Sequence, residues 1–348
     1  MNGVALMTVP TDGPADLGAL EALDAGGYAR DAVLAVVGKT EGNGCVNDFS
    51  RELAAAAWSA AVPPATMTVF SGGTEGVLSP HVNLLVRDDR RHDGFDRGLV
   101  AAVGETGPVP PVQVGRAGQL HAVADVVAKL CAELDVTADD VHLVLVKCPL
   151  LTTTQMAALH AEGHTPVVDD TYESMARSRA ASALGTALGL GETDAATAEA
   201  ALAGEASVSS ARASASAGAE LDDCQVLVLA ESSAAANPLR ALHGEMTDAL
   251  DLAAVSALLD EVARRGGAVR QIFAKAEADP SGAVRGHRHT MLTDSDVPAT
   301  RHARAAVGGL LAAVRGHGAV YVSGGAEHQG RPGGGSVTVV YELPGGAR

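Results

Sequence analysis

A five-residue phrase of the form Ser-small-Gly-x-Glu occurs three times in the chain and constrains its fold more than any other feature. Its copies are Ser71–Glu75, Ser216–Glu220 and Ser323–Glu327. Upstream of each copy an apolar run leads into a lysine, and these lysines are Lys39, Lys147 and Lys275. The chain has only four lysines against 21 arginines, so three of the four occupy equivalent places. The repeat predicts three successive homologous units, each with one Lys and one Ser-Gly turn.

An arginine recurs in the same order. After each lysine, an Ala-rich stretch begins at Arg51, Arg179 or Arg304. In the third unit Arg301 lies one turn earlier and competes with Arg304 for the equivalent place. Each unit therefore supplies one Lys, one Arg and one Ser.

Length and turn composition divide the chain into three. Its 348 residues suit two or three domains of roughly 100–130 residues. Stretches rich in Gly, Pro and Ser lie at Gly104–Pro111 and Ser232–Pro238. We predict repeat domains at 1–104, 105–236 and 237–348, with a helical insertion lengthening the second.

Helical periodicity alternates with β-branched runs, which predicts an α/β fold. Strands are expected at 32–37, 65–70, 82–86, 141–146, 225–229, 269–273, 319–322 and 336–341. Helices are expected at 17–23, 51–61, 122–134, 174–190, 193–204, 252–265 and 303–315. In most cases a predicted strand ends at a Lys or a Ser of the repeat.

Charge and hydropathy exclude several classes of partner. A formal charge of −17 without a basic block argues against nucleic acid. No apolar run is long enough to predict a membrane span, and the N-terminus does not resemble a signal peptide. Four scattered cysteines without a CxxC pair indicate reduced thiols. We expect a cytoplasmic protein.

A Ser and a Lys in each unit suggest nucleophilic catalysis. A serine hydroxyl needs a base, and lysine serves only if its pKa falls by about 3 units from about 10.4. Burial and neighbouring guanidinium groups both lower it. A Ser-Gly turn offers backbone N–H groups to an oxyanion, and arginine offers forked donors to carbonyls. The three glutamates either begin helices or orient the lysines.

The C-terminal phrase Ala326–Gly335 is rich in glycine. Its exposed backbone groups suit either a hard cation or an anion, and Glu277 is the nearest candidate for a carboxylate ligand.

Several motifs together resemble one family over essentially the whole chain. They are NDFSR (47–51), FSGGTEGVLSPH (70–81), RAASALG (179–185), SASAGAEL (214–221), TRHARAAVG (300–308) and SGGAEHQG (323–330). This set is similar to the ring-opening amidohydrolases, the cyanuric acid hydrolase and barbiturase family. The resemblance implies three homologous α/β domains around a pseudo-threefold axis, a central active site and a homotetramer.

The resemblance also implies roles for particular residues. The catalytic dyad would be Ser216 as nucleophile and Lys147 as its base. The substrate-binding residues would be Lys39, Arg51, Ser71, Gly72, Arg179, Ala217, Lys275, Arg304, Ser323 and Gly324. No organic cofactor is implied. A structural Mg²⁺ or Ca²⁺ would be held by Glu277 with backbone groups of Ala326, Gln329, Gly330, Arg331 and Gly334.

The expected substrate is a small cyclic imide. Three similar donor sets suit the three equivalent edges of cyanuric acid, which the family opens to 1-carboxybiuret. Barbituric acid, opened to ureidomalonate, is the alternative, because a barbiturase would show the same motifs. A non-catalytic binder of cyclic imides is the alternative from another class, although it would not need the Ser216 and Lys147 pair.

Overall fold

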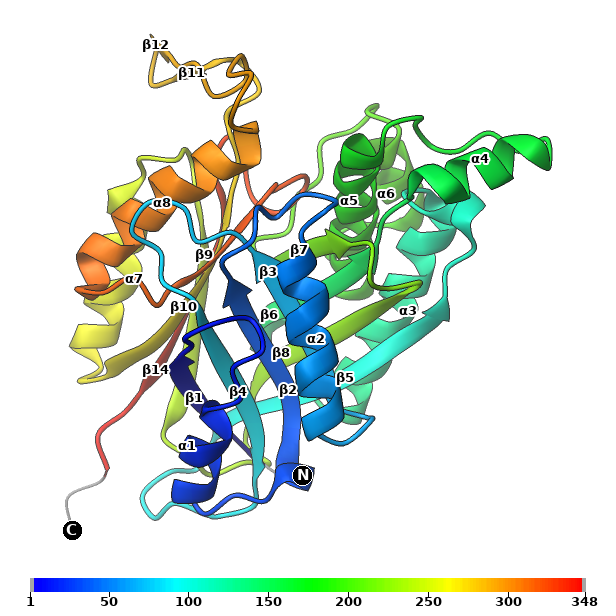
Figure 1. Ribbon diagram of the computed structural model, residues 1–348. Helices are drawn as coiled ribbons and strands as arrows, with labels where there is room; N and C mark the ends of the chain where they lie inside the picture. Colours follow the sequence, from blue (N-terminus) through cyan, green and yellow to red (C-terminus); the bar gives the residue numbers. More distant parts are fainter. Residues whose placement is uncertain (1–2, 346–348) are drawn as a thin grey trace.

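The computed structural model describes residues 3–345 and contains one α/β topology three times (Figure 1). The first unit comprises β1 (Gly3–Pro10), α1 (Ala19–Ala25), β2 (Val33–Thr40), α2 (Phe49–Ala61), β3 (Met67–Gly72) and β4 (His81–Asp88). The second comprises β5 (Gly98–Pro108), α3 (Ala117–Glu133), β6 (Val141–Pro149), α4 (Thr153–Ala161), α5 (Thr171–Gly189), α6 (Ala195–Leu202), β7 (Ala213–Gly218) and β8 (Asp223–Ser232). The third comprises β9 (Leu239–Met246), α7 (Leu252–Arg264), β10 (Ala268–Ala276), β11 (Ala283–Val284), β12 (His287–Arg288), α8 (Ala299–Arg315), β13 (Tyr321–Gly324) and β14 (Gly335–Glu342).

Each unit forms a four-stranded sheet with the same strand order. The orders are β1-β4-β2-β3, β5-β8-β6-β7 and β9-β14-β10-β13. In every sheet the strand that carries the lysine runs parallel to the strand that carries the serine, and the other neighbouring pairs are antiparallel. The repeat in sequence is therefore a repeat in topology.

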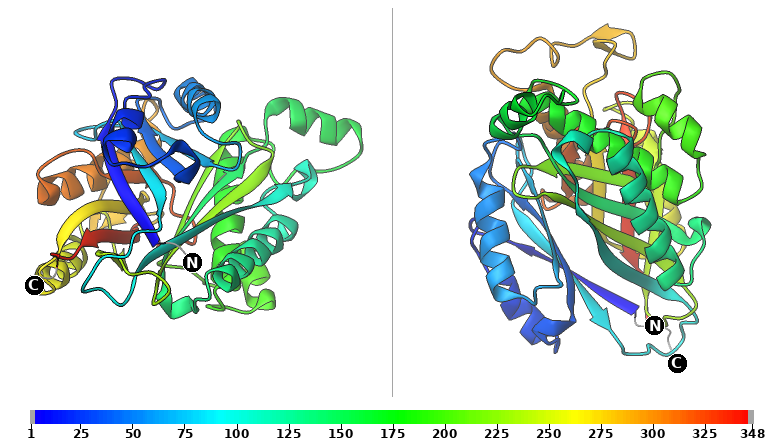
Figure 2. Two further views of the ribbon diagram at one scale, coloured as in Figure 1. Left: turned by 90° about the horizontal axis from the view of Figure 1, so that it is seen from below. Right: turned by 90° about the vertical axis from the view of Figure 1, so that its right-hand side faces the viewer.

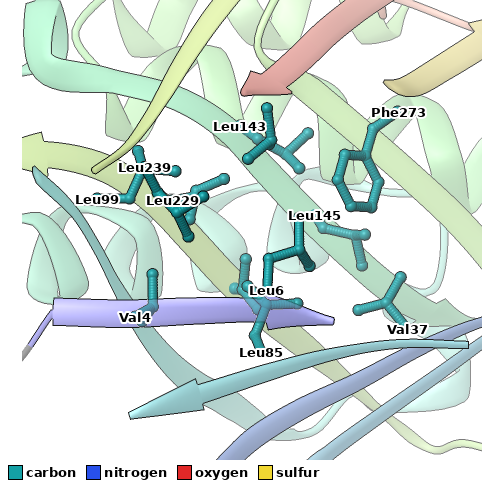
Figure 3. A pocket seen from close by; sticks show the side chains of 12 residues that line it. Val4, Leu6, Val37, Leu85, Leu99, Leu143, Leu145, Leu229, Leu239 and Phe273 are labelled. Atoms are coloured by element: carbon teal, nitrogen blue, oxygen red, sulfur yellow. The ribbon is translucent and has the colours of Figure 1, made fainter. Parts of the chain in front are cut away.

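Helices cover one face of each sheet, and the other faces meet at the centre (Figure 2). In the first unit Leu23 of α1 and Trp58 of α2 pack against Val36 and Leu84 of the sheet. The central core takes buried residues from all three sheets, including Leu85, Leu145 and Phe273 (Figure 3). The cavity there is lined by apolar side chains alone, so it belongs to the packing between units.

Local sequence signals set several helix ends. Asp48 caps α2 by accepting a hydrogen bond from the Ser50 N–H, and Asp170 caps α5 through the Glu173 N–H. Helix α8 ends at Gly316, whose φ of 76° is left-handed and favours glycine. These ends fix where the arginine-bearing helices begin and stop.

The α/β prediction with three repeated units is confirmed, but the first strand of each unit was missed, as were strand β7, which carries Ser216, and helix α4. Strands β1, β5 and β9 all lie at a sheet edge. After their first two or three residues, and apart from Met246, these strands are partly buried or exposed and lack a clear alternating pattern.

The predicted domain bounds remain a prediction. The bound after residue 104 falls within β5, which pairs with β8 of the second sheet, so sheet pairing favours a division between β4 and β5. The second bound falls between β8 and β9. Residues 1–2 and 346–348, at the ends of the first and third predicted domains, lie outside the described part.

Within residues 3–345, no helix is long and apolar enough to cross a membrane.

Candidate functional site

Strand pairing brings each lysine beside the serine of its own unit. Lys39 pairs with Ser71, Lys147 with Ser216, and Lys275 with Ser323. Because β-strand side chains alternate between faces, paired residues on parallel strands point the same way. The sequence order Lys, Arg, Ser thus becomes three similar clusters.

The three clusters surround one cavity. It is lined by Gly44, Arg51, Ser71, Gly72, Lys147, Tyr172, Met175, Arg179, Ser216, Ala217, Thr300, Arg304, Ser323 and Gly324. Lys39 and Lys275 are buried and donate to Ser71 and Ser323, which line it. All ten predicted substrate-binding residues and both members of the predicted dyad therefore lie in the cavity wall or one hydrogen bond from it.

Each arginine reaches out of its own unit toward the glutamate of the next one. Arg179 of the second unit donates to both oxygens of Glu327 in the third, at 2.7 and 2.8 Å. Arg304 of the third unit makes the same fork with Glu75 of the first, also at 2.7 and 2.8 Å. Arg51 of the first unit faces Glu220 of the second at 3.9 Å. The three contacts close a cycle around the cavity.

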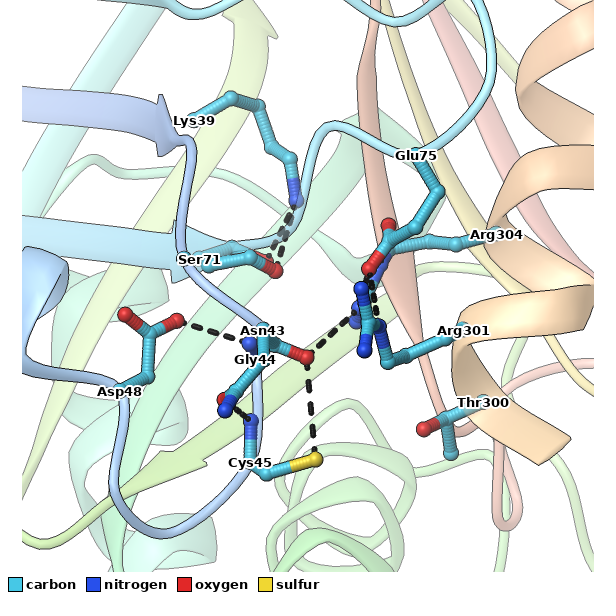
Figure 4. Close-up of polar contacts among 12 residues, drawn as sticks. Lys39, Asn43, Gly44, Cys45, Asp48, Ser71, Glu75, Thr300, Arg301 and Arg304 are labelled. Carbon is cyan, nitrogen blue, oxygen red and sulfur yellow. Dashed lines mark hydrogen bonds and ion pairs between the residues drawn. The ribbon is translucent and has the colours of Figure 1, made fainter. Parts of the chain in front are cut away.

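The positions of Arg301 and Arg304 show which of them is equivalent to Arg51 and Arg179 (Figure 4). Arg304 is buried and lines the cavity. Arg301 also contacts Glu75, but its side chain is 31% exposed. Arg304 is therefore the residue equivalent to Arg51 and Arg179, and Arg301 supports the same carboxylate from outside.

The middle cluster differs from the other two. The Lys39 ammonium is 3.1 Å from Ser71 Oγ, and the Lys275 ammonium is 3.0 Å from Ser323 Oγ. The Lys147 ammonium instead contacts Glu220 at 2.8 Å and donates to the Phe70 carbonyl at 3.0 Å.

Three buried atoms of the middle cluster are left unpaired. Ser216 Oγ, Glu220 Oε2 and Arg51 Nε have no hydrogen-bond partner within residues 3–345. Their counterparts in the other two clusters are paired. An unpaired buried polar atom is costly, so three in one cluster require an explanation.

The backbone of the middle turn also differs. Gly73 and Gly325 have left-handed φ values of 99° and 78°, whereas Gly218 stays outside that region. A Cβ at Gly73 would overlap the Arg304 guanidinium, and one at Gly325 would overlap that of Arg179. At Gly218 a Cβ would instead overlap the Glu220 carboxylate. The same phrase thus presents its glutamate in two ways.

The electrostatics follow these contacts. Burial, reinforced by Arg304, holds the pKa of Lys39 well below its usual value, and burial with Arg179 does the same to Lys275. Burial also lowers the pKa of Lys147, but the Glu220 charge opposes this. Although burial favours the neutral acid, Lys147 and Arg51 lower the pKa of Glu220 to about 2.

Five of the six predicted cation ligands lie on the C-terminal glycine-rich loop between β13 and β14, and the sixth, Glu277, follows β10. Glu277, Ala326, Gly330 and Arg331 line a second cavity, whereas the Gln329 side chain is buried and accepts from the Ala215 N–H. Glu277 accepts from the Gly333 N–H at 3.0 Å, and burial raises its pKa to about 6.

The half-buried Glu277 carboxylate is a candidate ligand of a hard cation, which would neutralise it. No group of three or more His, Cys, Asp or Glu side chains in residues 3–345 is arranged as a metal site. The predicted set contains a single acidic side chain.

Some site residues were not predicted. Tyr172 and Thr300 share a hydrogen bond of 2.7 Å between α5 and α8 at the cavity. Their places, seven and four residues before Arg179 and Arg304, differ between units, so no repeat marks them. The helix-start interpretation of the three glutamates was wrong, since all three lie in turns or loops. Only Glu220 matches the alternative role beside a lysine.

Hydroxyl, ammonium and guanidinium groups around a small cavity suit a compact carbonyl compound, and comparisons with known proteins agree. Residues 5–342 match the family described as amidohydrolase ring-opening protein. A cyanuric acid amidohydrolase from Rhodococcus sp. is 63% identical over 99% of this chain and 97% of its own. Another from Pseudonocardia dioxanivorans is 58% identical over 99% of both chains.

A solved structure of a cyanuric acid hydrolase, described as an evolutionary innovation by structural concatenation, has the same fold. Its TM-score is 0.94 at 42% identity, covering 98% of this chain and 100% of its own. This chain belongs to the ring-opening amidohydrolase family.

Proposed function

We propose that this chain is a cyanuric acid amidohydrolase. It would add one water across a ring C–N bond of cyanuric acid to give 1-carboxybiuret, which then loses CO2 to leave biuret. The observation that carries the proposal is that strand pairing places a lysine beside a serine three times around one cavity. Three similar donor sets match a ring with three equivalent edges, and the relatives named above support this choice.

Ser216 and Lys147 would form the catalytic dyad. Neutral Lys147 takes the proton of Ser216 Oγ as that oxygen attacks a ring carbonyl carbon. Collapse of the tetrahedral intermediate breaks the C–N bond, and the departing ring nitrogen receives the proton from Lys147. Water then cleaves the acyl-enzyme with Lys147 again as base, which frees Ser216.

The other two clusters would hold the ring. Ser71 and Ser323 donate to the remaining carbonyls, while Lys39 and Lys275 keep these hydroxyls oriented. Gly72, Ala217 and Gly324 line the cavity, where their backbone groups can approach the ring closely. Arg51, Arg179 and Arg304 supply charged donors along its edges.

Three further features belong to the proposal. A structural Mg²⁺ or Ca²⁺ at Glu277 and the backbone of the C-terminal loop would fix that loop beside Glu327. The protein would work in the cytoplasm as a homotetramer without an organic cofactor.

The decisive experiment measures ring opening of cyanuric and barbituric acids side by side. We expect cyanuric acid to turn over faster and the Ser216→Ala variant to lose activity on it. Faster turnover of barbituric acid would make the protein a barbiturase. Binding of either ring without turnover would make it a non-catalytic binder.

A further inference from the structure

Glu220 differs from its two counterparts in its partner. Glu75 and Glu327 each form a two-bond fork with an arginine from a neighbouring unit. Glu220 contacts Lys147 at 2.8 Å, and Arg51 lies 3.9 Å away. The glutamate of the repeat therefore binds an arginine in two clusters and a lysine in the third.

The unpaired atoms of this cluster indicate a second arrangement. In the other clusters the arginine Nε donates to the glutamate Oε2 at 2.8 Å, and the lysine donates to the serine. A move of the Glu220 carboxylate onto Arg51 would pair the Arg51 Nε with the Glu220 Oε2. It would also leave Lys147 free to approach Ser216. One movement therefore partners all three unpaired atoms.

The local backbone leaves room for the observed position. Because Gly218 has no side chain, the Glu220 carboxylate lies where a Cβ would be. At Gly73 and Gly325 the same space holds the arginine guanidinium. The carboxylate side chain is only 12% exposed, so its choice of partner acts in a medium of low polarity.

We propose that Glu220 is a positioning residue that alternates between Lys147 and Arg51 and thereby sets the protonation state of the catalytic base. This inference rests on the proposed function, since it assigns a role to the same dyad. With Glu220 on Lys147, the ammonium keeps its proton and stays away from Ser216.

Once Glu220 moves to Arg51, Lys147 is a buried ammonium beside a guanidinium and without a counterion. It releases its proton to solvent, and the neutral amine can then accept the proton of Ser216 Oγ. Glu220 raises the pKa of Lys147 and Arg51 lowers it, which agrees with this order of events.

The chain allows a direct test because it has only four lysines. Lysine labelled with ¹³C at Cε gives four signals, and a Lys147→Arg variant identifies the one from Lys147. In Glu220→Gln we expect the titration of Lys147 to shift down by about 1–3 pH units. The matched variants Glu75→Gln and Glu327→Gln should leave it in place, because those carboxylates hold arginines.

Kinetics give the second measurement. The acid limb of the pH profile of kcat/KM should shift down with the Lys147 signal in Glu220→Gln, whereas the matched variants raise KM and leave the limb unmoved. An unshifted Lys147 signal in Glu220→Gln, or equal shifts in all three variants, would overturn the role of Glu220. If Glu220→Gln does not fold, Glu220→Asp should give a smaller downward shift, because its shorter carboxylate weakens the contact.

A crystal structure of Ser216→Ala with cyanuric acid tests the movement itself. We expect the Glu220 carboxylate on Arg51, and finding it on Lys147 would overturn the alternation. The NMR titration uses no substrate, so failure of wild-type protein to bind or open cyanuric acid would refute the proposed function separately. That result would also refute a catalytic role for the alternation. The titration would still decide whether Glu220 controls the protonation of Lys147.

Discussion

The two outer clusters and the middle cluster share a sequence phrase but not an arrangement. Around Ser71 and Ser323, the hydroxyl, ammonium, guanidinium and carboxylate groups are paired with one another. Around Ser216, a hydroxyl, a guanidinium nitrogen and a carboxylate oxygen are buried without hydrogen-bond partners in the described part of the chain. Paired groups hold their positions, whereas unpaired groups remain available for a ligand. On the proposed assignment, a threefold sequence repeat encodes two supports and one reactive centre.

The largest expected difference concerns the serines. In Ser216→Ala we expect kcat to fall by more than about 10⁴-fold, because a nucleophile cannot be replaced by its neighbours. Ser71→Ala and Ser323→Ala remove one donor each and should lower kcat/KM by about 10–100-fold. Steady-state hydrolysis of cyanuric acid measures all three. Equal losses would show that the middle serine has no special role.

The next difference is in stability. Arg179→Ala leaves Glu327 without its fork, and we expect a loss of about 3 kcal/mol, the low end for a buried pair because the Glu327 side chain is 25% exposed. Arg51→Ala should cost only about 1–2 kcal/mol, since Glu220 keeps Lys147. Urea unfolding of both variants provides the test. Arg304→Ala should lose an intermediate amount of stability, because Arg301 remains in contact with Glu75. A larger loss in Arg51→Ala than in Arg179→Ala would contradict the comparison.

A third prediction separates the pH dependence of the scaffold from that of the site. His142 of β6 and His243 of β9 lie 3.0 Å apart between the second and third sheets. Burial lowers the pKa of His142 from 6.5 to about 3 and that of His243 to about 4. Below pH 6.5 the unfolded chain therefore binds protons that the folded protein does not, and stability falls with pH until the folded pKa is reached.

Between pH 7 and pH 5 this costs about 2 kcal/mol for His142 alone. In His142→Asn we expect a smaller acid-induced drop in the free energy of unfolding, measured by urea denaturation at both pH values. The acid limb of activity, which the proposed mechanism assigns to Lys147, should not move. A joint shift of both would tie the site to this interface and weaken the assignment of the limb to the middle cluster.

The smallest expected difference concerns the turn glycines. Gly73→Ala and Gly325→Ala place a side chain at a left-handed φ, and the added Cβ also overlaps the Arg304 or Arg179 guanidinium, so each should cost at least about 1–2 kcal/mol. Gly218→Ala has no such backbone penalty, but its Cβ would displace the Glu220 carboxylate. We therefore expect Gly218→Ala to lose less thermal stability than the other two variants and to change the pH profile of kcat/KM more. The opposite pattern would argue against two kinds of turn.

The sequence was sufficient to predict the repeat and most of the residues that line the central cavity. Lys39 and Ser71 could be paired in advance, because strands ending in them had to share a sheet. Arg304 could not be chosen over Arg301, because that choice depends on burial and not on spacing. The arginine–glutamate forks were also missed, since their partners come from different units and can be more than 200 residues apart.

The missed strands have a different cause. β5 contains Gly104, Gly107 and Pro108, which favour turns, and its pairing with β8 overrides that local preference. Likewise, the distinct state of Gly218 follows from its φ and from the position of Glu220, neither of which a shared phrase specifies.

The cycle of arginines reaching into neighbouring units affects how the protein is made. During synthesis the first unit leaves the ribosome before Arg304, the partner of Glu75, has been made, because Arg304 follows Glu75 by 229 residues. The second unit likewise holds Arg179 before Glu327 exists. A chain that stops early therefore leaves the central apolar faces of the first two sheets uncovered, which favours its removal by quality control. Activity begins only when the last unit has docked, so turnover reports that the whole chain has been completed.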